Sequence, residues 1–217
     1  MEAEQRPLLR GWSHAVAVAP ALAGAVVLVV LARGDPAKQV SLVVYGAALT
    51  LLFTISALYH RVLWTPGWRA VWRRLDHANI FVVIAATYTP IAANMLNGWV
   101  RVAVLAGIWA AALTGASLVA APLTLPRPAM VGLYIGVGWL ALFIIPMLYT
   151  RLGPLGVALL FGGGALYSLG AAMYAMRRPR LWPRVFGYHE AFHLLVIAAS
   201  ALFFVVIAVS VVPATHG

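Results

Sequence analysis

The sequence contains no cysteine, and only 9% of its 217 residues are charged. The lack of cysteine excludes a disulfide framework and a thiolate metal site, so any metal ion must be held by nitrogen and oxygen ligands. A soluble domain has about a quarter of its residues charged, whereas 64% of this chain is apolar. The composition therefore predicts a membrane protein.

The few charged residues divide the chain into seven long runs that contain no Asp, Glu, Lys or Arg. Each run exceeds the 18 or so residues that a helix needs to cross roughly 30 Å of hydrocarbon. A backbone in lipid must satisfy its own hydrogen bonds, and these runs are too long for the strands of a membrane barrel. We therefore predict an all-α membrane protein, a single seven-transmembrane helix bundle over residues 1–217. Its spans are expected at about 15–31, 39–60, 77–96, 102–119, 130–149, 155–176 and 189–212.

The basic residues are distributed unequally between the two sides of these spans. Eleven of the 15 Lys and Arg residues fall at the N-terminus or in connections on the same side, and four fall on the opposite side. Because short cytoplasmic connections are enriched in Lys and Arg, we expect a cytoplasmic N-terminus and a C-terminus outside. The apolar run continues to Leu31, which favours an uncleaved first span over a signal peptide. The arginines lie in short connections rather than along one folded face, so no nucleic-acid partner is expected.

Three tryptophans recur at every fourth position before the third span, at Trp64, Trp68 and Trp72. Arginines lie among them, so the segment predicts a short helix on the inner membrane surface, with its indoles among the lipid headgroups. We interpret it as an anchor rather than as a functional site.

The last apolar run opens with Tyr188-His189-Glu190-Ala191-Phe192-His193. Residues i and i+4 of a helix share one face, so His189 and His193 can reach one metal ion. His-Glu-x-x-His is also the signature of zinc hydrolases in which the glutamate acts as base. The motif therefore predicts a metal site, provided that a third ligand exists. Glu190 is either that base or a favourable charge at the start of the helix.

His60, Ser56 and Asp76 are expected at the same membrane depth as this pair, because one span ends near residue 60 and the next begins near residue 76. Ser56 and His60 share a helical face. Each ionisable group inside a membrane costs a few kcal/mol, so a chain with several at one level is expected to use them together. Asp76 should face inward, and His77, about 100° further around the helix, should face the interface or a neighbouring span. His14, where the first span begins, is expected to be solvated rather than a ligand.

We expect Zn²⁺ as the cofactor, with His60, His189 and His193 as its ligands. Three neutral imidazoles leave a fourth tetrahedral position for water, whose pKa zinc lowers toward about 7. Asp76 is then a general base or a residue that orients a histidine, and Ser56 is a hydrogen-bond partner of the water or of a substrate carbonyl. The alternatives are a closed structural zinc site that ties three helices together, and histidines solvated at the interface without a metal.

These segments together resemble the signature motifs of the hemolysin III family. They are Ser56-x-x-x-His60, Leu75-Asp76-His77 followed by Thr87-Tyr88-Thr89-Pro90, and His189-Glu190-x-x-His193-Leu194. The family comprises bacterial relatives of the progestin and adipoQ receptors, in a superfamily with alkaline ceramidases. The resemblance covers all seven spans and implies a zinc ion near the cytoplasmic face, held by the three histidines, with Asp76 and Ser56 beside it. It also implies a link to cytolysis and to membrane-lipid homeostasis, and a place in the plasma (bacterial inner) membrane.

Three functions are open at this point. The first is a ceramidase-like, zinc-dependent hydrolase of an amide or ester bond, with a membrane lipid inside the bundle as substrate and with Asp76 and Ser56 as catalytic residues. The second is a non-enzymatic membrane sensor or regulator, receptor-like or cytolytic, whose zinc is structural. The third is an intramembrane metalloprotease with Glu190 as base. The third is disfavoured, because such proteases need an aspartate ligand from a distant span and no aspartate follows Asp76.

Overall fold

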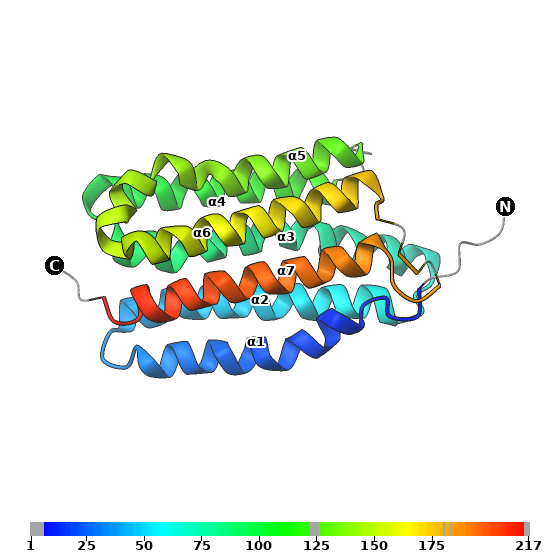
Figure 1. Ribbon diagram of the computed structural model, residues 1–217, viewed down its shortest axis with the longest axis horizontal. Coiled ribbons are helices and arrows are strands. Elements are labelled where there is room, and N and C mark those ends of the chain that lie inside the picture. The colour runs from blue at the N-terminus through cyan, green and yellow to red at the C-terminus, as the bar shows by residue number, and fades with distance from the viewer. Residues whose placement is uncertain (1–6, 122–125, 180, 183, 215–217) are drawn as a thin grey trace.

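The computed structural model describes residues 7–121, 126–179, 181–182 and 184–214, which form a bundle of helices (Figure 1). The helices are α1 (Trp12–Leu31), α2 (Pro36–Arg61), α3 (Pro66–Met95), α4 (Gly98–Ala120), α5 (Arg127–Gly138), α6 (Ile145–Met176) and α7 (Tyr188–Val206). A 3-10 helix, η1 (Trp139–Phe143), joins α5 to α6, and a π-helix, η2 (Ile207–Val211), continues α7. The predicted all-α class is confirmed.

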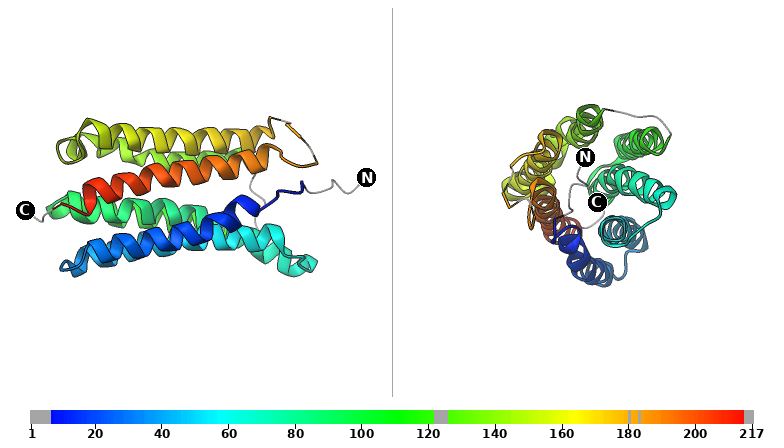
Figure 2. Two further views of the ribbon diagram at one scale, coloured as in Figure 1. Left: turned by 60° about the horizontal axis from the view of Figure 1, so that its bottom comes forward. Right: turned by 90° about the vertical axis from the view of Figure 1, so that its right-hand side faces the viewer.

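Consecutive helices lie side by side and form a ring when the bundle is viewed along its length (Figure 2, right). α1 packs against both α2 and α7, so the first and last helices of the chain are neighbours. The end of α2 and the beginnings of α1, α3 and α7 lie together at one end of the bundle (Figure 1). We call this the histidine end, because it contains His60 and His189.

Among the described residues, six helices are long and apolar enough to cross a membrane, which supports the predicted membrane class: Trp12–Leu31, Pro36–Arg61, Pro66–Met95, Gly98–Ala120, Ile145–Met176 and Tyr188–Val211. α3 is the most enclosed of them, with 67% of its apolar window buried inside the protein. α1 and α4 bury only 17% of theirs, so the apolar side chains that they direct outward are suited to contact with lipid.

The segment expected as the fifth span, 130–149, does not form one continuous α-helix. α5 and η1 together cover Arg127–Phe143, a shorter apolar stretch than the six long helices, and α6 begins at Ile145. The physical reason is Pro146, which has no N–H for the hydrogen bond that a continuous α-helix needs at that position. The backbone before it therefore adopts the tighter 3-10 winding.

The expected boundary between the fifth and sixth spans is marked by a break inside α6. Gly153 has φ 64° and ψ 177°, a conformation that residues with a Cβ rarely adopt, and Pro154 follows directly. The helix axis of α6 therefore changes direction at this glycine. The sixth expected span, 155–176, corresponds to the part of α6 that follows the break.

α3 begins at Pro66, well before the expected start of the third span at residue 77. The prediction of a separate surface helix is wrong, because Trp68 and Trp72 belong to α3. Trp64 stacks on Trp72 with ring centroids 4.8 Å apart, and its indole N–H donates a 3.0 Å hydrogen bond to the carbonyl of Leu58. These contacts close the turn from α2 to α3 and so fix the end of α2 against the first turns of α3.

Candidate metal centre

His189 and His193 occupy the first turns of α7, where Glu190 caps the helix. One carboxylate oxygen of Glu190, Oε2, accepts a 2.8 Å hydrogen bond from the backbone N–H of Gly187. The other, Oε1, forms an ion pair with the Nε of Arg10, and Glu190 is only 2% exposed. Both oxygens of this carboxylate therefore fix the beginning of α7. The helix in turn places the two histidines one turn apart on the same face.

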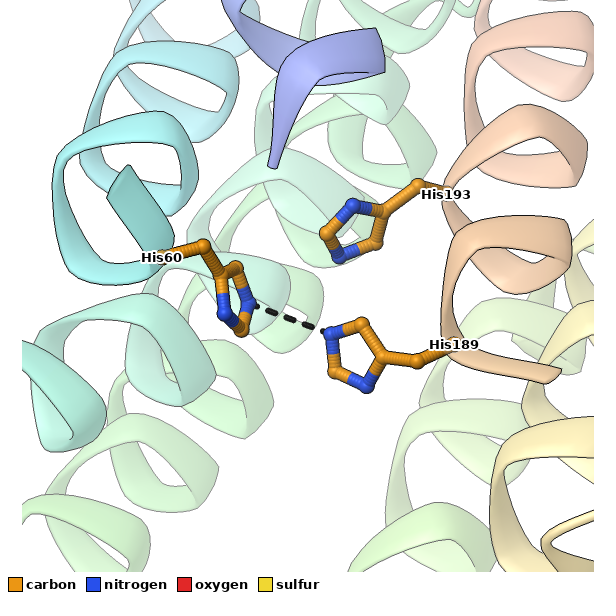
Figure 3. A group of neighbouring side chains, drawn as sticks. All are labelled: His60, His189 and His193. Carbon is orange, nitrogen blue, oxygen red and sulfur yellow. Dashed lines mark hydrogen bonds between the residues drawn. The ribbon is translucent and has the colours of Figure 1, made fainter. Parts of the chain in front are cut away.

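His60, the penultimate residue of α2, meets the two histidines of α7. Its Nε2 lies 3.1 Å from the Nε2 of His189. One nitrogen from each of the three rings lies within 4.8 Å of the other two. Figure 3 shows the three imidazoles, from α2 on one side and α7 on the other, facing the space between these helices. The structure thus brings together the three residues that the sequence singled out as metal ligands.

The geometry of these nitrogens fits a metal ion. Two imidazole nitrogens 3.1 Å apart carry lone pairs that repel each other unless a proton or a cation lies between them. Nitrogens bound to one tetrahedral ion at about 2.0–2.1 Å lie about 3.4 Å from each other, close to the separation of His60 and His189. A set of imidazoles without thiolates suits divalent zinc, copper, nickel or iron. The three histidines could therefore hold one such ion.

Asp76 and Ser56 lie beside this group. The Oδ2 of Asp76 is 3.8 Å from the Nε2 of His60, and the hydroxyl of Ser56, which is 2% exposed, adjoins the same carboxyl group. His77 faces a neighbouring helix, as expected, since its Nε2 lies 3.3 Å from the hydroxyl of Tyr174 on α6. Asp76 is therefore the acid that faces the histidines.

A cavity of about 180 Å³ extends from this site into the bundle. Its walls are mostly apolar side chains of α3, α5, η1, α6 and α7, whereas Ser56, Asp76 and the histidines of α7 line its histidine end. Along α7 the lining reaches from His193 to Phe203, about 15 Å at the rise of an α-helix. The candidate metal centre is thus the polar end of an elongated apolar cavity.

His14 also belongs to the site, and the expectation that it is solvated is wrong. The residue is 3% exposed, and its ring stacks on that of His193 with centroids 3.8 Å apart and planes 12° apart. The sequence carried a signal for this placement: the first span begins at the same membrane face as the spans that begin with Asp76 and His189. The argument that ionisable residues at one membrane depth are used together applies equally to His14.

The segment Leu8–Gly11, which we call the N-terminal strap, lies against the histidine end. The backbone N–H groups of Leu8 and Leu9 donate hydrogen bonds of 3.0 and 3.2 Å to the carbonyls of residues 184 and 185. Gly11 has φ 80°, and a Cβ at this position would lie 2.7 Å from the Cβ of His60. The strap thus packs against α2 and the segment that leads into α7, and it can do so only with glycine at position 11.

The sequence is similar to those of known proteins along nearly its whole length. The family model described as "Haemolysin-III related" matches residues 3–204. "Hemolysin-3" of Bacillus cereus is 31% identical over 203 residues, which is 93% of this chain and 90% of that protein. "Hemolysin-3 homolog" of Bacillus subtilis (strain 168) is 30% identical over 196 residues, 88% of each chain. With its apolar helices and its histidine motifs, this multi-pass integral protein of the bacterial plasma (inner) membrane belongs to the haemolysin III-related family.

Proposed function

We propose that the protein is a zinc-dependent hydrolase that cleaves an amide or ester bond of a membrane lipid. The observation that carries the proposal is that Asp76, His189 and His193 line the polar end of an apolar cavity, with His60 directly beside them. An elongated apolar cavity suits an acyl chain, and the few polar groups at one end suit the bond that joins the chain to its headgroup.

The roles of the individual residues follow from their positions. Zn²⁺, when bound by the three histidines, would supply an activated water for hydrolysis. Asp76 orients the attacking water and accepts its proton at a carboxylate that lies 3.8 Å from the ring of His60. The buried hydroxyl of Ser56, which adjoins the Asp76 carboxyl group, turns to donate its hydrogen bond to the carbonyl oxygen of the substrate when the substrate binds. The apolar walls exclude bulk water, which strengthens these electrostatic interactions.

Glu190 is a helix cap in this proposal and not the catalytic base. Its two carboxylate oxygens are occupied by the Gly187 N–H and by Arg10. A base must lie within reach of the proton that it accepts, and Asp76, unlike Glu190, is among the described residues that line the cavity. The metalloprotease hypothesis needs such a role for Glu190, so the observed contacts disfavour it.

We also propose that the chain crosses the membrane seven times, with the N-terminus in the cytoplasm and the C-terminus outside. Two observations support this: the break at Gly153 divides the region from α5 to α6 into two segments, and α1 begins at the opposite end of the bundle from the end of η2 (Figure 1). A reporter that fluoresces only in the cytoplasm and one active only outside, each fused after residue 214, test the topology. Fluorescence from the first fusion would contradict it.

The test of the catalytic proposal uses the full-length protein in lipid nanodiscs. Zinc content is measured first, and a stoichiometric ion is expected. Hydrolysis is then followed with lipids that carry an amide-linked or an ester-linked acyl chain, by mass spectrometry of the released fatty acid. Asp76→Asn should retain zinc and lose turnover, and Glu190→Gln should retain both. Zinc-loaded protein that releases no fatty acid from any of these lipids would refute the enzymatic proposal.

A second candidate function is favoured by the names of the two Bacillus relatives, both of which contain the word hemolysin. In this case the protein acts on membranes without turnover, as a sensor or cytolytic protein, and zinc serves to join α2 to α7. A membrane phenotype that is lost with His60→Ala but persists in Asp76→Asn would support this function over hydrolysis.

A further inference from the structure

His14 is buried without satisfying its polar atoms. Neither ring nitrogen makes a hydrogen bond of good geometry with the residues that the structure describes, and the backbone of His193 is near enough only for a weak one. The side chain also lines the cavity, together with Ser56, Asp76 and the histidines of α7. A buried polar group without a partner destabilises a fold, so its presence at a cavity indicates a partner that binds there.

The environment of His14 shows that packing alone does not require an imidazole. One face of the ring lies against His193, with centroids 3.8 Å apart, and Phe53 lies 5.0 Å away at 53°. A phenyl ring would fill the same space and make the same aromatic contacts without burying two polar nitrogens. The nitrogens of His14 therefore point to a polar interaction.

His14 is not placed to be a fourth metal ligand. An imidazole binds a metal ion in the plane of its own ring, along the lone pair of one nitrogen. The rings of His14 and His193 are within 12° of parallel and lie one above the other, so lone pairs in the two planes run alongside each other and do not converge. His14 can instead reach an atom that lies in the cavity above the face of His193.

We propose that His14 is a ligand-binding residue that donates a hydrogen bond to an oxygen atom of a small ligand held at the three-histidine site. The ligand class is a carbonyl, carboxylate or hydroxamate, whose oxygen is an acceptor and whose remainder extends into the apolar cavity. A neutral imidazole has one N–H to donate, so no change in protonation is required. This inference rests on the metal site of the proposed function and adds to it a residue that contacts the substrate.

The experiment uses the full chain in nanodiscs, loaded with Co²⁺ in place of zinc, and acetohydroxamate as the probe. Binding of the probe is followed by the visible absorption of Co²⁺, and the affinity for Co²⁺ is measured by competition with a chelator. His14→Phe keeps the aromatic packing and removes both nitrogens. His14→Gln keeps a donor, and Phe53→Leu is the control that alters the packing of His14 but leaves its imidazole in place.

We expect His14→Phe to bind Co²⁺ as tightly as the wild type and to bind acetohydroxamate about tenfold more weakly, since a hydrogen bond to a charged ligand is lost. His14→Gln should recover part of the affinity for the probe, and Phe53→Leu should stay within about twofold of the wild type. Should His14→Phe not fold, His14→Leu is measured in its place with the same expectation.

Equal affinity of the wild type and His14→Phe for acetohydroxamate would overturn the inference while leaving the metal site intact. A large loss of Co²⁺ affinity in folded His14→Phe would also overturn it, because His14 would then be a metal ligand. Wild-type protein that binds neither Co²⁺ nor Zn²⁺ would overturn the metal site of the proposed function, and with it this inference. The metal titration of the wild type therefore separates the two kinds of failure.

Discussion

Arg10→Met should destabilise the fold more than Glu190→Gln, although the two residues are partners in one ion pair. The asymmetry follows from their burial: the Glu190 side chain is 2% exposed, whereas that of Arg10 is 22% exposed. Without Arg10, the carboxylate remains buried with the Gly187 N–H as its remaining contact. Without the charge of Glu190, the guanidinium can still reach water or lipid headgroups.

The magnitudes follow from the same contacts. An uncompensated buried charge costs about 3–5 kcal/mol, which is the expected loss for Arg10→Met. Glutamine at position 190 still offers an oxygen to the Gly187 N–H, so Glu190→Gln should cost about 1–2 kcal/mol. The double variant should be more stable than Arg10→Met alone, because the unpaired carboxylate has been removed.

These differences are measured by equilibrium unfolding of the protein in detergent with increasing SDS, followed by tryptophan fluorescence. Eight tryptophans provide the signal. The three variants and the wild type form a double-mutant cycle, from which the coupling energy of the pair is obtained. Additive effects, with the double variant the least stable of the three, would refute the reasoning that Glu190 is a buried charge held by Arg10.

Three further predictions concern the site and the packing around it. Each of the variants His60→Ala, His189→Ala and His193→Ala should lose stoichiometric zinc binding, measured by elemental analysis of the purified protein. A variant that retains one zinc per chain would contradict the assignment of that histidine as a ligand. Asp76→Asn should keep the zinc content and lower lipid turnover by at least about a hundredfold, as expected for a lost general base; turnover within tenfold of the wild type would exclude that role. Gly115→Ala should cost about 1–3 kcal/mol, because its Cβ would lie 2.4 Å from the ring of the fully buried Phe81. Gly107→Ala is the matched control on the same helix, since its Cβ would meet none of the described atoms within 4 Å; a similar loss in both variants would argue against the packing explanation.

The membrane class and the positions of most helices could be predicted from the sequence, because insertion into lipid requires long runs without charge. The approach of His60 to the α7 histidines could also be anticipated, since alternating spans bring the end of one helix to the depth at which another begins. The break at Gly153 lies between the predicted fifth and sixth spans, so its approximate place could also be predicted, whereas the 3-10 winding before Pro146 could not. Whether a proline or glycine bends, divides or merely weakens a helix depends on the neighbours that pack against it.

The ion-pair partner of Glu190 could not be predicted from sequence patterns, for a different reason. Arg10 lies 180 positions from Glu190, and no periodicity connects the two. His14 was judged by its place at a helix end, where most histidines are solvated, whereas the contact between α1 and α7 buries it. Both contacts bring residues of the N-terminal part of the chain, Arg10 and His14, against the beginning of α7.

The separation of the three candidate metal ligands along the chain has a consequence for biosynthesis. His60 and His189 are 129 positions apart, so at about 5–20 residues per second the ribosome needs on the order of 10 s to synthesise the second after the first. During that interval α2 and α3 can already be in the membrane, with His60 next to Asp76 but without the ligands of α7. A metal ion held by all three histidines could therefore bind only after the last helix has been made. Metal content would then report on whether a molecule has been completed and fully inserted.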